Sequence, residues 1–168
     1  MTEELKQDYL RKMYKISGLA MKLYNELKYG FSEPIYQECL AILFTENNIP
    51  WEREKELTMM FHGQQLEKTY KADFVCYGNI VLELKAISEI GGEHRSQLFN
   101  YLRITGIEAG MLINFGEAKG IHTERYIFDE NKDGYELVYG DGRPKPKFYP
   151  GSNIPYDSLW KWGFVEIC

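Results

Sequence analysis

The chain has 168 residues, 44% of them hydrophobic, and a formal charge of −5. This length and composition predict one compact domain, and the net negative charge argues against a broad electrostatic footprint for polyanions. No apolar run reaches the ~20 residues of a membrane helix, and the start of the chain lacks the apolar region of a secretory signal, so we expect a cytoplasmic protein without membrane contact.

Two amphipathic helices are predicted in the first third of the chain. Apolar side chains recur at helical spacing over residues 5–28, and Gly30 ends this helix. The second helix begins after Ser32. Within it, Glu38 lies between apolar positions, so we expect its carboxylate to point towards the sheet. Glu33, in the first turn, is assigned only to the helix dipole.

Three strands should follow, over residues 51–61, 65–76 and 80–87. The first alternates between apolar and polar residues, as expected of a strand with one solvent-exposed face. Gly78-Asn79 predicts a tight hairpin between the other two. Because successive side chains of a strand point to opposite faces, Glu83 and Lys85 share one face. Hairpin pairing could bring Asp73 onto the same face.

Two carboxylates and an ammonium inside an otherwise apolar sheet predict a metal site. Close carboxylates repel each other unless a cation lies between them, and oxygen-only ligation suits Mg²⁺ or Mn²⁺. A lysine beside the metal can orient or deprotonate the attacking water. The alternative is that Glu83 and Lys85 form an ion pair on an edge strand, with Asp73 in a turn.

The rest of the chain predicts a helix, a buried strand and a further hairpin. In the helix, residues 93–104, Gln97 and Tyr101 stand four apart and share a face. His94 lies one turn before Gln97 and is given no role. Residues 109–115 are almost wholly apolar, as a central strand should be. The hairpin should pair residues 123–128 with 135–139, and an irregular, partly docked tail should follow to residue 168.

This order of helices, strands and motifs resembles the PD-(D/E)xK nuclease superfamily. Within it, Gly30-x-x-Glu33-x-x-Tyr36 resembles the signature of the small bacterial GxxExxY proteins. The resemblance implies an α/β (α+β), restriction-endonuclease-like fold with an αβββαβ core and a mixed central sheet flanked by helices. The core would span about residues 6–115 of a single domain, 1–168, and the extra hairpin and tail would form an extension, 116–168.

The resemblance also implies roles for the residues of the motifs. Asp73 and Glu83 would bind the divalent metal, Mg²⁺ or Mn²⁺, with Glu38 and a backbone carbonyl near Leu84 completing the site. Lys85 would support the nucleophilic water.

The Q-x-x-x-Y pair, Gln97 and Tyr101, is similar to that of RecB-like nucleases, where it lies beside the active site and helps to hold the site or the substrate strand.

The leading hypothesis is therefore a metal-dependent nuclease that hydrolyses phosphodiester bonds in nucleic acid, with DNA preferred to RNA as the partner. The alternative is a nucleic-acid-binding or regulatory module that keeps the nuclease fold without turnover. A homo-oligomer, or a subunit that acts only in a larger complex, is a third possibility.

Overall fold

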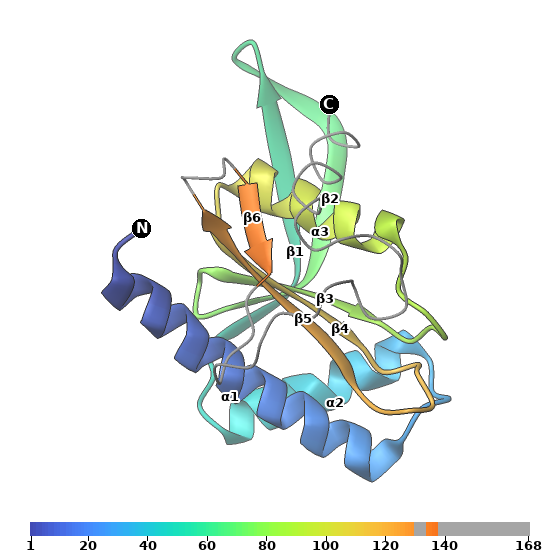
Figure 1. The fold of residues 1–168 in the computed structure, drawn as a ribbon. Helices are drawn as coiled ribbons and strands as arrows, with labels where there is room; N and C mark the ends of the chain where they lie inside the picture. Colours follow the sequence, from blue (N-terminus) through green and yellow to red (C-terminus); the bar gives the residue numbers. More distant parts are fainter. Residues whose placement is uncertain (130–133, 138–168) are drawn as a thin grey trace.

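The computed structural model describes residues 1–129 and 134–137, and the predicted tail lies outside them. Three helices and six strands make up this part of the chain (Figure 1). In chain order they are α1 (Glu3–Leu27), α2 (Glu33–Glu46), β1 (Trp51–Phe61), β2 (Gln64–Cys76), β3 (Ile80–Lys85), α3 (Gly92–Thr105), β4 (Ala109–Asn114), β5 (His122–Asp129) and β6 (Gly134–Leu137).

The six strands form one mixed sheet in which spatial order follows chain order. Strands β3 and β4 are parallel, and α3 makes the crossover between them; every other neighbouring pair is antiparallel. Helices α1 and α2 cover one face of the sheet and α3 covers the other (Figure 1). The predicted mixed sheet, αβββαβ order and additional hairpin are confirmed.

Strand β3 shows why this chain folds into three layers. Leu82 and Leu84 are buried in the layer formed with α1 and α2, whereas Val81 is buried in the layer formed with α3. The alternation of a strand therefore places Glu83 and Lys85 on the α3 face, as their spacing predicts.

The turn between β2 and β3 is one residue longer than predicted. Cys76 pairs with Ile80, so residues 77–79 form the connection. Tyr77 and Gly78 both have positive φ angles, 55° and 71°. The left-handed conformation thus begins at a tyrosine, where it is less favourable than at glycine.

The outer half of the β1–β2 hairpin projects from the body of the molecule (Figure 1). All residues from 58 to 68 are exposed. The prediction that only one face of this strand is solvent-exposed therefore holds only as far as Leu57. Met59, Met60 and Phe61 lie in this exposed part of the hairpin. No helix in the described part of the chain is long and apolar enough to cross a membrane.

Candidate active site

Asp73 lies where strands β2 and β3 stop pairing with each other. The ladder ends with Phe74 opposite Leu82, and the same register would next place Asp73 opposite Glu83. In place of a further ladder bond, the Leu84 amide donates a hydrogen bond to Asp73 Oδ2 at 2.7 Å. The divergence of the two strands therefore makes room for two carboxylates side by side.

The other neighbour of β2 is also distorted at this point. Arg53 pairs with Phe74 and Lys55 pairs with Ala72, which leaves Glu54 across from Asp73. Glu54 has a φ of +51°, a conformation that glutamate rarely adopts. Backbone strain of this kind is frequent where a side chain must be held in a functional position.

Glu83 is a buried carboxylate that is incompletely satisfied. Its side chain is 2% exposed, and its Oε2 atom lies 3.9 Å from Lys85 Nζ. Its Oε1 atom is buried without a hydrogen-bond partner within the described part of the chain. Burial, followed by the charge of Asp73, raises the pKa of Glu83 to about 9. Burial also raises the pKa of Asp73, against the Leu84 amide and Lys85.

The Lys85 ammonium is held by the Q-x-x-x-Y pair on α3. Lys85 Nζ donates to Gln97 Oε1 at 3.0 Å, and Gln97 Nε2 donates to Tyr101 Oη at 3.1 Å. Burial, followed by the charge of Glu83, raises the pKa of Tyr101 to about 12, so its hydroxyl keeps its proton. The structure therefore brings Asp73, Glu83, Lys85, Gln97 and Tyr101 together.

The structure corrects the choice between the two glutamates of α2. Glu38 is exposed and does not point towards the sheet. Glu33 is half-buried beside the site; burial, followed by the charge of Asp73, raises its pKa. Glu33 and Gln37 are four residues apart and share a helix face, and Gln37 Nε2 lies 3.4 Å from Asp73 Oδ1. Glu38 is turned away because each residue rotates the helix by about 100°.

Gln37 was not predicted as a site residue. It also accepts a hydrogen bond from Arg53 at 3.0 Å, so it links the start of α2 to β1 beside Asp73. The available signal in the sequence was a glutamine four residues after Glu33, on the same face of the predicted helix. His94, by contrast, accepts a hydrogen bond from the Gly91 amide at 2.8 Å, which gives it a capping role at the start of α3.

The residues of the site fit a divalent cation. A buried carboxylate oxygen without a partner and two carboxyl groups with raised pKa values both favour a cation between Asp73 and Glu83. The described residues contain no group of three His, Cys, Asp or Glu side chains gathered as ligands. A pair of carboxylates suits Mg²⁺, which usually keeps several of its waters.

A second charged cluster is buried between α3 and β5. Arg95 donates to both oxygens of Glu124, at 3.0 Å and 2.7 Å. His122 lies between two carboxylates, with Nε2 3.1 Å from Glu124 and Nδ1 2.7 Å from Glu117. Nothing in the sequence pattern singled out these residues, because the pair that joins α3 to β5, Arg95 and Glu124, is 29 residues apart along the chain.

Comparison with protein-family models matches residues 11–126 to the PD-(D/E)XK nuclease superfamily. The chain belongs to this superfamily. The matched range includes both carboxylates, Lys85 and the Q-x-x-x-Y pair, so the superfamily predicted from the motifs is confirmed.

Among solved structures, this PD-(D/E)XK protein is similar to one titled "Crystal structure of SSO0001". The two chains are 24% identical over 59% of this chain and 52% of the other, with a TM-score of 0.46. The chain thus spans about half the length of that structure. A comparison with curated proteins found no match.

In this PD-(D/E)XK protein, Glu83→Gln should stabilise the metal-free fold. The folded pKa of Glu83, about 9, lies above its ordinary value of 4.5. The wild-type fold therefore has its full stability below pH ~4.5 and loses stability as the pH rises towards 9. Glutamine has the same shape without the charge. At pH 7 the substitution should raise the free energy of unfolding by roughly 2–3 kcal/mol.

Denaturant titration in EDTA at pH 5 and pH 8 measures this effect. The gain should be small at pH 5 and large at pH 8, and added Mn²⁺ should stabilise the wild type but not the variant. Glu38→Gln, an exposed glutamate, is the matched control and should change neither quantity. An equal gain at both pH values would contradict the raised pKa of Glu83.

Proposed function

We propose that this chain is a metal-dependent nuclease that hydrolyses phosphodiester bonds in nucleic acid, with DNA preferred to RNA. One observation carries the proposal: the half-buried Asp73, the buried Glu83 and Lys85 converge where β2 and β3 separate, and Glu83 Oε1 lacks a partner among the described residues. Membership in a superfamily of nucleases supports it.

In this proposal, Asp73 and Glu83 hold Mg²⁺ or Mn²⁺. The Leu84 carbonyl is a third donor, since the amide and carbonyl of a strand residue point to the same side and the Leu84 amide faces Asp73. Glu33, rather than Glu38, is the helix glutamate that assists them. The bound metal would polarise the phosphodiester and lower the pKa of a coordinated water.

Lys85 has the role of holding the attacking water and offsetting charge that develops on the phosphate. Its ammonium is bound at 3.0 Å by Gln97 but lies 3.9 Å from Glu83. This arrangement keeps Lys85 from closing a tight ion pair with Glu83, and Glu83 Oε1 stays available to a metal. Gln97 and Tyr101 are thus positioning residues for Lys85.

We further propose that the chain is of the GxxExxY kind, because each residue of that signature has a distinct physical role here. Gly30 has a φ of +112° in the connection between α1 and α2. The buried Tyr36 donates its hydroxyl to the Lys28 carbonyl and stacks on Phe115 at 4.5 Å. These contacts fix the start of α2, which carries Glu33 towards the carboxylates.

A cleavage assay tests the proposed function. Purified protein should cut labelled single-stranded or double-stranded DNA or RNA in Mg²⁺ or Mn²⁺ and leave it intact in EDTA. Asp73→Asn should abolish cleavage, whereas Asp8→Asn on α1 should retain it. Full cleavage by Asp73→Asn would refute the assignment. Nucleic-acid binding without cleavage of any substrate would instead favour a binding or regulatory module.

A further inference from the structure

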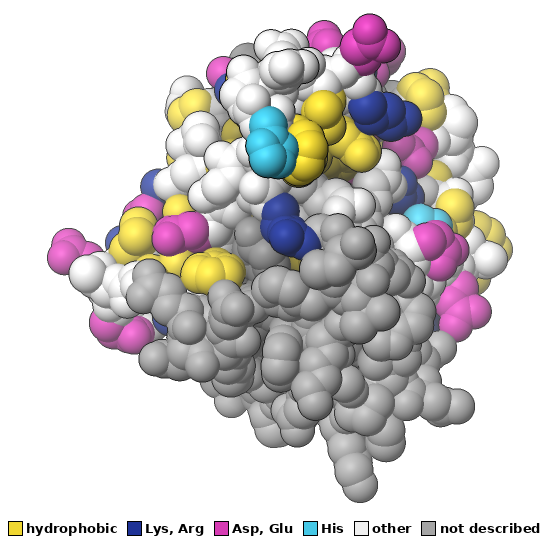
Figure 2. Space-filling view, turned by 90° about the horizontal axis from the view of Figure 1, so that it is seen from above, with side chains coloured by type: hydrophobic (Ala, Val, Ile, Leu, Met, Phe, Trp, Pro, Cys, Tyr) yellow, Lys and Arg dark blue, Asp and Glu magenta, His cyan; other side chains and the backbone are white. Residues whose placement is uncertain are grey.

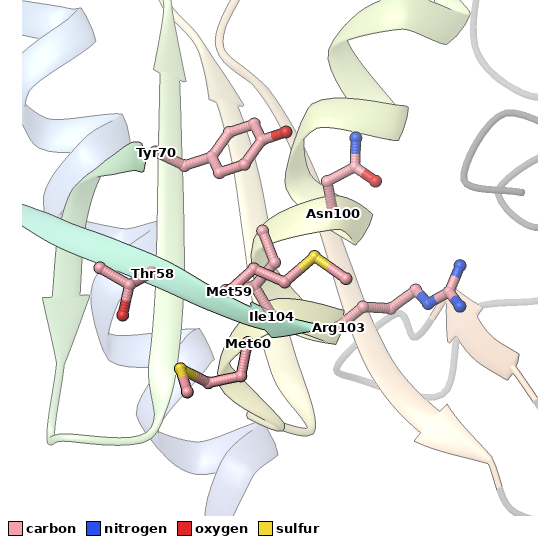
Figure 3. Close-up of a pocket in the computed structure, with 7 residues that line it drawn as sticks. All are labelled: Thr58, Met59, Met60, Tyr70, Asn100, Arg103 and Ile104. Carbon is pink, nitrogen blue, oxygen red and sulfur yellow. The ribbon is translucent and has the colours of Figure 1, made fainter. Parts of the chain in front are cut away.

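A groove lies between the β1–β2 hairpin and α3 (Figure 3). Its volume is about 490 Å³, and its walls come from β1, β2 and α3. The seven lining residues are Thr58, Met59, Met60, Tyr70, Asn100, Arg103 and Ile104. Figure 3 shows the Tyr70 ring reaching from its strand towards the Asn100 side chain on the helix.

A chain of side-chain contacts joins one wall of the groove to the candidate active site. The Tyr70 ring meets the Tyr101 ring edge-on at 5.8 Å, and Tyr101 is linked through Gln97 to Lys85. On α3, residues 97, 101 and 104 follow one face of the helix, because they are spaced four and three apart. Seven residues of helix span ~10 Å, so the groove lies within about that distance along α3 of Gln97, which accepts a hydrogen bond from Lys85.

The lining has the composition of a surface that binds bases and phosphates. Tyr70 offers an aromatic ring, Met59 and Met60 offer polarisable thioethers, and Asn100 and Thr58 offer hydrogen bonds. Arg103 is the one charged group among the seven lining residues, and none of them is a carboxylate. Arginine is a common phosphate-binding side chain, so its presence in the lining suits an anionic ligand.

We propose that this groove binds unpaired bases of a single-stranded nucleic acid next to the phosphodiester that is cut. The position of the cut rests on the proposed nuclease function; the binding of single strands does not. A base can stack on Tyr70 only if its face is uncovered, and the faces of bases inside a duplex are covered by neighbouring pairs. The groove therefore selects unpaired nucleotides.

The projecting hairpin extends this binding surface. Lys68 lies over the Tyr70 ring, with Nζ 5.7 Å from the ring centroid, and Met59, Met60 and Phe61 are exposed on the same hairpin. Viewed from above, hydrophobic side chains gather beside a histidine with a basic side chain close by (Figure 2). Exposed apolar groups with a basic group close by suit a flexible strand with phosphates and exposed bases.

Fluorescence anisotropy in EDTA tests the inference without cleavage. A labelled single-stranded oligonucleotide should bind more tightly than the same sequence as a duplex. Tyr70→Leu should weaken single-strand binding roughly tenfold, whereas Tyr70→Phe, which keeps the ring, should bind as the wild type does. Tyr29→Leu, an exposed tyrosine away from the groove, is the control and should have no effect.

A second pair of variants guards against a folding defect in Tyr70→Leu. Asn100→Asp keeps the side-chain shape but adds a negative charge to the groove, and it should weaken binding roughly fivefold. Asn25→Asp on α1 should leave binding unchanged. Wild-type affinity in both Tyr70→Leu and Asn100→Asp, or tighter binding of the duplex, would overturn the inference.

Cleavage separates the two proposals. If the single-strand preference depends on Tyr70 but no substrate is cut in Mg²⁺ or Mn²⁺, the groove stands and the nuclease proposal fails. If substrates are cut but binding ignores Tyr70 and Asn100, the nuclease proposal stands and the groove fails.

Discussion

Lys85→Met should lower the rate of phosphodiester cleavage by about 10²–10⁴-fold and leave metal binding in place. The expected loss follows from the position of Lys85, which Gln97 holds at 3.0 Å on the same strand face as Glu83. Methionine keeps the length of the side chain and removes the charge. The metal-binding carboxylates would be unaltered.

Calorimetric titration with Mn²⁺ and a cleavage assay on the same preparation separate these two effects. The charge of Lys85 lowers the pKa of Glu83, so the variant should need a higher pH to bind the metal, and the titration belongs near pH 9. Glu83→Gln should lose both binding and cleavage. Lys22→Met on α1 is the matched control and should lose neither. If Lys85→Met cuts at the wild-type rate, Lys85 has no catalytic role.

Arg95→Met should destabilise the fold by about 3–5 kcal/mol at pH 7. Arg95 is 3% exposed and Glu124 is 1% exposed, so loss of the guanidinium removes the partner that binds both oxygens of a buried carboxylate. The hydrogen bonds from His122 and Arg95 outweigh burial and hold the pKa of Glu124 at about 2. Because this folded pKa is depressed, the stabilisation is present above pH ~4.5 and is lost as the pH falls towards 2.

Denaturant titration at pH 7 and pH 3 measures the expected cost. The difference between wild type and Arg95→Met should shrink at pH 3, where Glu124 begins to protonate in the variant. Adding Glu124→Gln to the variant should restore part of the stability, because the buried carboxylate that lost the Arg95 guanidinium is then replaced by a neutral amide. Arg11→Met, whose side chain is 69% exposed, should cost less than about 0.5 kcal/mol. A cost of similar size for Arg95 would contradict this account.

Much of the site could be predicted from the sequence because it depends on local periodicity. The alternation of β3 is a property of the extended backbone, so Glu83 and Lys85 had to share a face wherever the strand lay. The spacing of four between Gln97 and Tyr101 likewise placed them on one face of α3. Short connections between strands limited where Asp73 could lie relative to Glu83.

The choice between Glu33 and Glu38 could not be made in this way. Both lie near apolar residues of an amphipathic helix, and the rotation of α2 against the sheet depends on the packing of Tyr36 and the rest of the core. Neighbouring residues of a helix point about 100° apart, so a side chain one position along can face solvent while its neighbour faces the site. Helix rotation is set by contacts that are distant along the chain.

The sequence by itself determined the order of elements, the face of β3 that carries the charged residues, and the superfamily to which they belong. Only the tertiary structure decided that Glu33 faces Asp73, that Arg95 meets Glu124, and that Tyr70 and α3 enclose a groove. The physical reason is the range of the interactions. Backbone geometry specifies neighbours a few residues apart, whereas pairs separated by tens of residues are specified by how the layers pack.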